Sequence, residues 1–159
     1  MPEASIVQKI KAHLRSVTDL TLLVLKGHLL VEEQINWALS EVMPNPAALD
    51  DARLTFSQRI KLLRALNSNE IVDRALGFAE RLNTMRNMLA HQLEPAGLEE
   101  SVKKFVTEVA ASMPVQRFEV QGTPNLHVAM CVAYICGLLY AFRHATRIVQ
   151  SHISAENGG

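Results

Sequence analysis

The sequence predicts an all-α fold, a single bundle of about five to six helices. Apolar residues recur at spacings of three and four, capping side chains precede these runs, and prolines and glycines fall between them. No alternating apolar pattern reaches the length that a sheet needs. The chain has 159 residues, 48% of them hydrophobic. We therefore expect one domain over 1–153 and a flexible tail over 154–159.

Two helices are expected in the first third of the chain. Apolar residues every four positions predict a short helix from Ile6 to Leu14. Asp19 can cap a second helix that runs to about Val42 and stops before Pro44. The segment 45–53 is then expected to be a loop.

The next two helices have clear start signals. Thr55 and Gln58 have the spacing of a capping box for a third helix. The sequence Asn-Ser-Asn at 67–69 ends that helix, and Glu70 and Asp73 suit the N-terminus of a fourth. The expected apolar stripes comprise Ile60, Leu63 and Leu66 in the third helix, and Ile71, Ala75, Phe78, Leu82, Met85 and Leu89 in the fourth.

The last third of the chain predicts two more helices around an irregular segment. A fifth helix is expected over 98–111, and 115–124 is expected to be irregular, with one short extended piece at 117–120. Asn125 is expected to cap a last helix that ends at about Ser151.

Composition restricts the functional classes. The chain has 16 basic and 16 acidic residues, so no global positive field holds a long nucleic acid, and RNA contacts must be local. The apolar run 128–142 is too short to span a bilayer and is interpreted as a core helix. Cys131 and Cys136 within it are expected to be buried, reduced thiols. No leader pattern is visible, so we expect a cytoplasmic protein without a membrane partner.

The most informative segment is Arg-Asn-Met-Leu-Ala-His at 86–91, at the end of the fourth helix. The planar fork of Arg86 can bind phosphate, and His91 can exchange a proton near neutral pH. On an ideal helix these two side chains point about 140° apart, so one straight helix cannot present both to a small ligand. Either the helix unwinds after Asn87, or two copies of the chain bring these side chains together.

A structural role for the motif is the alternative. Arg86 and His91 at a helix end can bind backbone carbonyls and interact favourably with the helix dipole. The histidines lack the paired spacings of zinc sites, and the sequence indicates neither a metal nor a cofactor.

The motif resembles the Arg-x-x-x-x-His signature of the HEPN superfamily. The resemblance covers about Leu20 to Pro95 and includes Gly-His-Leu-Leu-Val-Glu-Glu at 27–33 and Leu-Leu-Arg-Ala-Leu at 62–66, in that order. It implies a HEPN-like bundle and a dimeric, metal-independent endoribonuclease, such as a toxin or phage-defence effector, that cuts an RNA substrate. It further implies a composite site across a twofold axis.

The resemblance also implies roles for individual residues. His91 would be the general acid or base, Arg86 would hold the phosphate, and Asn87 would orient His91 or the phosphate. Leu93 stands where many HEPN toxins paired with a nucleotidyltransferase antitoxin carry the tyrosine that the antitoxin modifies. This departure argues against silencing by that route.

A second family keeps a non-catalytic function open. The chain is similar in helix order to the mannitol operon repressor group, in the fourth helix and in the segment from Phe105 to Phe118. That similarity implies a regulator or immunity protein that binds another protein.

Other polar residues are candidates for a supporting role. Glu32 or Glu33 can form a salt bridge with Arg86, or can pair in an ordinary helix–helix contact. Asn83 lies on the same stripe of the fourth helix as His91. Gly27 lets a neighbouring helix or a ligand approach closely. The third helix has a basic edge of Arg59, Lys61 and Arg64, which is either solvated or bound to RNA backbone.

Overall fold

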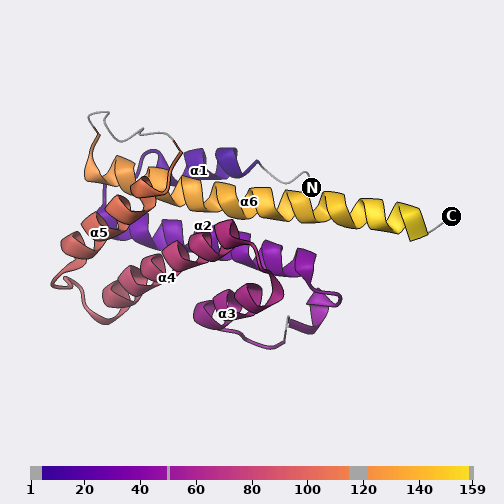
Figure 1. Ribbon diagram of the computed structural model, residues 1–159. Helices are drawn as coiled ribbons and strands as arrows, with labels where there is room; N and C mark the ends of the chain where they lie inside the picture. Colours follow the sequence, from indigo (N-terminus) through magenta and orange to yellow (C-terminus); the bar gives the residue numbers. More distant parts are fainter. Residues whose placement is uncertain (1–4, 50, 115–121, 158–159) are drawn as a thin grey trace.

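The computed structural model describes residues 5–49, 51–114 and 122–157, and these residues confirm the all-α class (Figure 1). No strand occurs among them. The elements are α1 (Ile6–Leu14), α2 (Leu20–Val42), the 3-10 helix η1 (Pro46–Leu49), α3 (Phe56–Leu66), α4 (Glu70–His91), α5 (Leu98–Ala111) and α6 (Pro124–Asn157).

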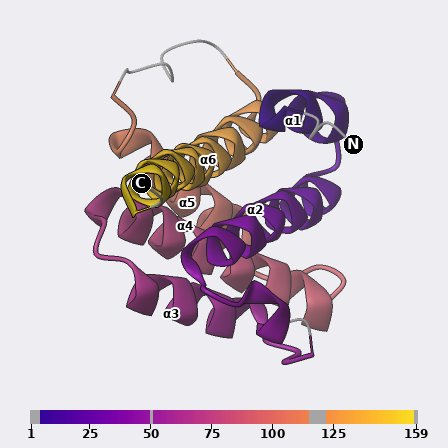
Figure 2. The same ribbon diagram turned by 90° about the vertical axis from the view of Figure 1, so that its right-hand side faces the viewer.

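The helices α2 and α6 form the centre of the bundle. α2 packs against α1, α3, α4 and α6, and Figure 2 shows the helices grouped around this pair. Gly27 permits the close approach of α6, because a Cβ atom there would lie 2.8 Å from Cγ2 of Val132. The expectation that Gly27 lets a helix come close is confirmed.

The predicted N-caps Asp19 and Thr55 are confirmed, and the structure adds Asn69, which the sequence analysis placed only in the break before α4. The Asp19 side chain accepts a hydrogen bond from the Leu22 amide, and the Asn69 side chain accepts from the amides of Ile71 and Val72. Thr55 and Gln58 form the reciprocal capping box at the start of α3. The first halves of α2, α3 and α4 are therefore set by local sequence.

The predicted cap of the last helix is wrong. Thr123, and not Asn125, accepts the hydrogen bond from the Leu126 amide at 3.2 Å, and Pro124 occupies the first helical position. The Asn125 side chain instead donates to the backbone carbonyl of Thr18. The side chain of Asn125 thus forms a tertiary contact instead of the predicted cap.

The predicted boundaries need two further corrections. The expected tail from 154 is helical through Asn157, because Ala155 and Glu156 favour helix and 154–157 contains no glycine. The expected loop 45–53 contains the 3-10 turn Pro46–Leu49. The expected irregular segment 115–124, with its extended piece at 117–120, lies mostly outside the described residues.

The predicted apolar stripe of α4 is only partly correct. Leu82 and Met85 are fully buried, whereas Leu89 is half-buried and Ile71 is 53% exposed. The buried face also includes residues that the stripe omitted. They are Val72, Leu76 and Ala79. α4 is covered by α2, α3, α5 and α6, so its buried face is wider than a single stripe.

The last helix is longer than the apolar run that predicted it. α6 has 34 residues, and its segment Pro124–Ala155 is long and apolar enough to cross a membrane by length and composition. The expectation concerned the run 128–142 alone, and the helix extends beyond that run at both ends. Core packing is confirmed for its first half, where the buried residues are Val128, Cys131, Val132, Ile135, Cys136 and Leu139.

The two cysteines are free and buried, as expected. Burial raises the pKa of the Cys131 and Cys136 thiols to about 12. Both thiols are therefore protonated and unreactive at neutral pH.

Candidate functional site

The motif lies on the last two turns of a continuous helix. α4 extends through His91, and the Gln92 amide closes it by donating to the Met88 carbonyl. The helix therefore does not unwind after Asn87, and that way of bringing the motif together is wrong. In one chain, the side chains of Arg86 and His91 remain about 140° apart.

Arg86 continues the buried side of α4 but is itself exposed. By helical periodicity it points in nearly the same direction as Ala75, Ala79 and Leu82, which are buried. Arg86 is exposed although it projects from the helix on the same side as these buried residues, so neighbouring helices no longer cover this side of α4 at Arg86. The core-facing side of α4 thus opens to solvent at its C-terminal end.

Asn87 is oriented toward Arg86 rather than toward His91. The Arg86 Nη1 donates to Asn87 Oδ1 at 3.2 Å, and both side chains are exposed. His91 is exposed as well. Within one chain, the amide of Asn87 therefore restricts the arginine and leaves the histidine side chain open to solvent.

A buried histidine lies beneath this surface. His28 on α2 is 5% exposed, and its Nε2 lies 3.0 Å from Oδ1 of Asn83 on α4. Its ring packs against the Phe56 ring, with 4.3 Å between centroids. Asn83 in turn donates through Nδ2 to the Ser57 hydroxyl at 3.4 Å. The cluster joins α2, α3 and α4 directly beside the motif.

Electrostatics connect this cluster to Arg86. Burial is the main cause that lowers the pKa of His28, and the positive charge of Arg86 lowers this pKa further. The hydrogen bond with Asn83 and the negative charge of Glu32 raise the pKa in part. His28 is therefore neutral at neutral pH. With its proton on Nε2 it donates to Asn83 Oδ1, which leaves Asn83 Nδ2 free to donate to Ser57.

The two candidate glutamates face different neighbours. Glu32 lies with its carboxylate 3.9 Å from His28 Nδ1, whereas Glu33 forms an ion pair of 2.5 Å with Lys9 of α1. Within the described ranges, neither glutamate forms an ion pair with Arg86. Of the two alternatives, the ordinary helix–helix contact is therefore found for Glu33, which pairs with Lys9 of α1, and the Arg86 salt bridge is not formed by the described residues.

The predicted basic edge of α3 is largely occupied. Arg64 pairs with Glu80 at 3.0 Å and Asp73 at 2.5 Å, and the hydrogen bond to Glu80 is the main cause that raises its pKa. Arg59 donates to the Leu54 carbonyl and to Asn36. Of the three, only Lys61 is left exposed without such a contact in the described structure. The edge therefore does not form an open track for RNA.

Metal ligation is not indicated by the described part of the chain, where no group of three or more His, Cys, Asp or Glu side chains is placed to hold an ion. Comparison of the chain with protein-family models, with curated proteins and with solved structures found no match. The relation to HEPN proteins therefore depends on the motif and the order of helices alone.

Proposed function

We propose that this protein is a HEPN-type, metal-independent endoribonuclease that acts as a symmetric homodimer. Arg86 of one protomer and His91 of the partner subunit would line one cleft. The observation that carries this proposal is the exposure of Arg86 on the otherwise buried side of α4. A second copy that covers this side would supply the histidine that the same helix cannot present.

The neighbouring surface of α2 supports a second copy as the occupant. α2 and α4 run in opposite directions, so the first half of α2 lies beside the end of α4 (Figure 1). That half exposes Leu22 and Leu29, and Leu93 beyond α4 is 99% exposed. Exposed apolar side chains of this kind suit an interface between identical subunits.

The chemistry follows from the residue types. A base removes the proton from an RNA 2′-hydroxyl, whose oxygen bonds to the adjacent phosphorus while the bond to the 5′-oxygen breaks. The 5′-oxygen takes up a proton as it leaves. His91 serves either as the general base at the 2′-oxygen or as the general acid at the 5′-oxygen, and solvent exchanges the other proton. Arg86, held by Asn87, binds the phosphate and offsets the charge of the transition state. The products end in a 2′,3′-cyclic phosphate and a 5′-hydroxyl.

Cleavage of single-stranded RNA in the presence of a chelator tests the activity. Wild-type protein should cut, whereas Arg86→Ala and His91→Ala should not, with folding checked by circular dichroism. His152→Ala is the matched control, because His152 is exposed on the last turns of α6. Equal cleavage by wild type and both motif variants would mean that the activity comes from a contaminant, and would refute the proposal.

A non-catalytic regulator or immunity protein is the second candidate. The observation that favours it is the end of α6, which extends beyond the rest of the bundle in Figure 1. Ile148, Val149 and Ile153 are about half exposed there. Such an arm suits a protein partner, for example an antitoxin or another regulatory protein, in the cytoplasm. Folded wild-type protein that cuts no RNA would favour this candidate.

A further inference from the structure

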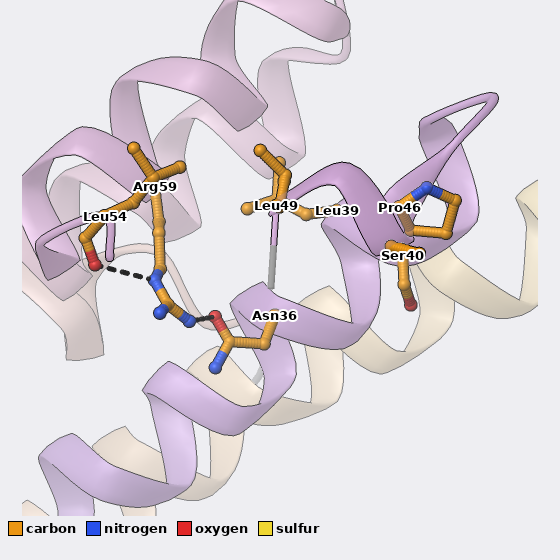
Figure 3. Close-up of a pocket in the computed structure, with 8 residues that line it drawn as sticks. Asn36, Leu39, Ser40, Pro46, Leu49, Leu54 and Arg59 are labelled. Carbon is orange, nitrogen blue, oxygen red and sulfur yellow. Dashed lines mark hydrogen bonds between the residues drawn. The ribbon is translucent and has the colours of Figure 1, made fainter. Parts of the chain in front are cut away.

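A cavity of about 490 Å³ lies between the C-terminal half of α2, η1 and the segment that enters α3. Figure 3 shows Asn36 and Leu39 of α2, Pro46 and Leu49 of η1, and Leu54 and Arg59 around it. The volume falls in the range of small-molecule sites, roughly 300–1,000 Å³. None of these residues belongs to the motif of α4.

Arg59 is positioned at this cavity by two neutral acceptors. Its Nε donates to the Leu54 carbonyl at 3.1 Å, and its Nη1 donates to Asn36 Oδ1 (Figure 3). A guanidinium has about five N–H donors, so about three remain for another acceptor. The two existing bonds fix the group before any ligand arrives, which lowers the entropic cost of binding.

Arg59 forms no ion pair with the described residues. Among residues 5–49, 51–114 and 122–157, no carboxylate lies within ion-pair distance of its guanidinium, although Arg64 on the same helix has two. Arg59 is partly buried, and several of its neighbours in the cavity wall are apolar. A partly desolvated cation beside apolar side chains favours an anion as its partner.

We propose that this cavity binds a small organic carboxylate with a short apolar body. The carboxylate would accept hydrogen bonds from the free donors of Arg59. The apolar body would pack against Leu39, Leu49 and Leu54. Bound there, the ligand would contact α2, η1 and α3 together.

The cavity is separate from the candidate ribonuclease site. Asn36 lies eight residues after His28 on α2. At 1.5 Å per residue this places the two Cα positions about 12 Å apart along the helix. Ligand binding can therefore be tested independently of RNA cleavage, and its failure leaves the proposed function untouched.

Binding is tested with hexanoate and with 1-hexanol, its uncharged counterpart of equal chain length, by NMR titration of the isotope-labelled chain. Hexanoate should produce saturable shifts at the Leu49 and Leu54 amides and at the Arg59 Nε–H resonance. Hexanol should bind at least tenfold more weakly, and inorganic phosphate should not saturate, because it lacks the apolar body. The proposal would be overturned if hexanoate and hexanol bound with equal affinity, or if the shifts caused by hexanoate did not saturate.

Variants separate the charge from the shape of the cavity. Arg59→Gln should weaken hexanoate binding at least tenfold, and Arg59→Lys should weaken it less. Lys61→Gln removes one positive charge from an exposed position on the same helix and should leave the affinity unchanged. If Arg59→Gln does not fold, the hexanoate affinities of Arg59→Lys and Lys61→Gln are compared instead, and only that of Arg59→Lys should be weaker than wild type. Wild-type affinity in the folded Arg59 variant would contradict the proposal.

Discussion

His28 and Asn83 connect α2 to α4 through a hydrogen bond of 3.0 Å between Nε2 and Oδ1. They are 55 residues apart in the chain, and the bond lies at the junction where Phe56 and Ser57 of α3 also meet. The bond fixes the position of α4 one turn before Arg86. The geometry of the motif thus depends on a buried contact between helices.

Asn83→Ala should destabilise the protein by about 1–3 kcal/mol, because it leaves the buried ring nitrogen of His28 without a partner. Urea unfolding followed by circular dichroism measures the change. Thr84→Ala is the control, since Thr84 is exposed and its hydroxyl donates only to the Glu80 carbonyl of its own helix. A loss in Asn83→Ala no larger than that in Thr84→Ala would show that the bond contributes nothing.

Stability should fall as the pH is lowered through about 6.5. Burial lowers the pKa of His28 below its ordinary value of 6.5, so the unfolded chain binds this proton more readily than the folded chain. The contribution of this shift to the free energy of unfolding is therefore fully present above pH 6.5. It is lost as the pH falls from 6.5 through the lower pKa of the folded state. Glu32 and Arg86 are the charged groups that act on this ring.

Replacing the histidine tests the source of this pH dependence. His28→Gln should flatten the dependence of the unfolding free energy on pH between about pH 5 and 7, a window that includes the ordinary pKa of 6.5 and extends below it. His144→Gln should not, because His144 is exposed on α6. An unchanged slope in His28→Gln would assign the dependence to another group.

Leu82→Ala should cost about 2–5 kcal/mol, the range for a fully buried leucine. Ile71→Ala on the same helix should cost less than about 1 kcal/mol, since Ile71 is 53% exposed. Denaturant unfolding of both variants provides the comparison. Similar losses at the two positions would refute the assignment of the buried face of α4.

Two helical glycines should respond in opposite directions to alanine. Gly77→Ala should stabilise α4 by roughly 1 kcal/mol, because a Cβ there meets nothing within 4 Å. Gly27→Ala should be destabilising by roughly 1 kcal/mol or more, because its Cβ would press on the buried Val132 side chain. Thermal unfolding measures both, and a stabilised Gly27→Ala would show that α2 and α6 are not so closely packed.

Local sequence predicted most of the fold. Capping bonds join residues two or three positions apart, so the caps Asp19 and Thr55 could be predicted without any tertiary information. Asn69 caps α4 by the same short-range geometry, although the sequence analysis identified only a helix break there. The predicted cap at Asn125 was wrong because Thr123 accepts the capping hydrogen bond. The Asn125 side chain donates to the Thr18 carbonyl instead. The exposure of Ile71 likewise depends on which neighbours cover α4.

The candidate site was less predictable. The motif could be found because Arg86, Asn87 and His91 lie within one short segment of a single helix. The cluster of His28 and the cavity at Arg59 could not, because each requires knowledge of how α2, α3 and α4 pack. A helical projection shows that Glu32 and Glu33 face different ways, but only the structure shows which one faces α1.

The most direct test of the composite site mixes two inactive variants. If Arg86 of one subunit acts with His91 of the partner subunit, a dimer of Arg86→Ala with His91→Ala retains one complete site. Random exchange makes half of the dimers mixed, each with one of two sites, so about a quarter of wild-type RNA cleavage should return. Wild-type cleavage by a protein that light scattering shows to be monomeric, or no recovery after verified subunit exchange, would contradict the account.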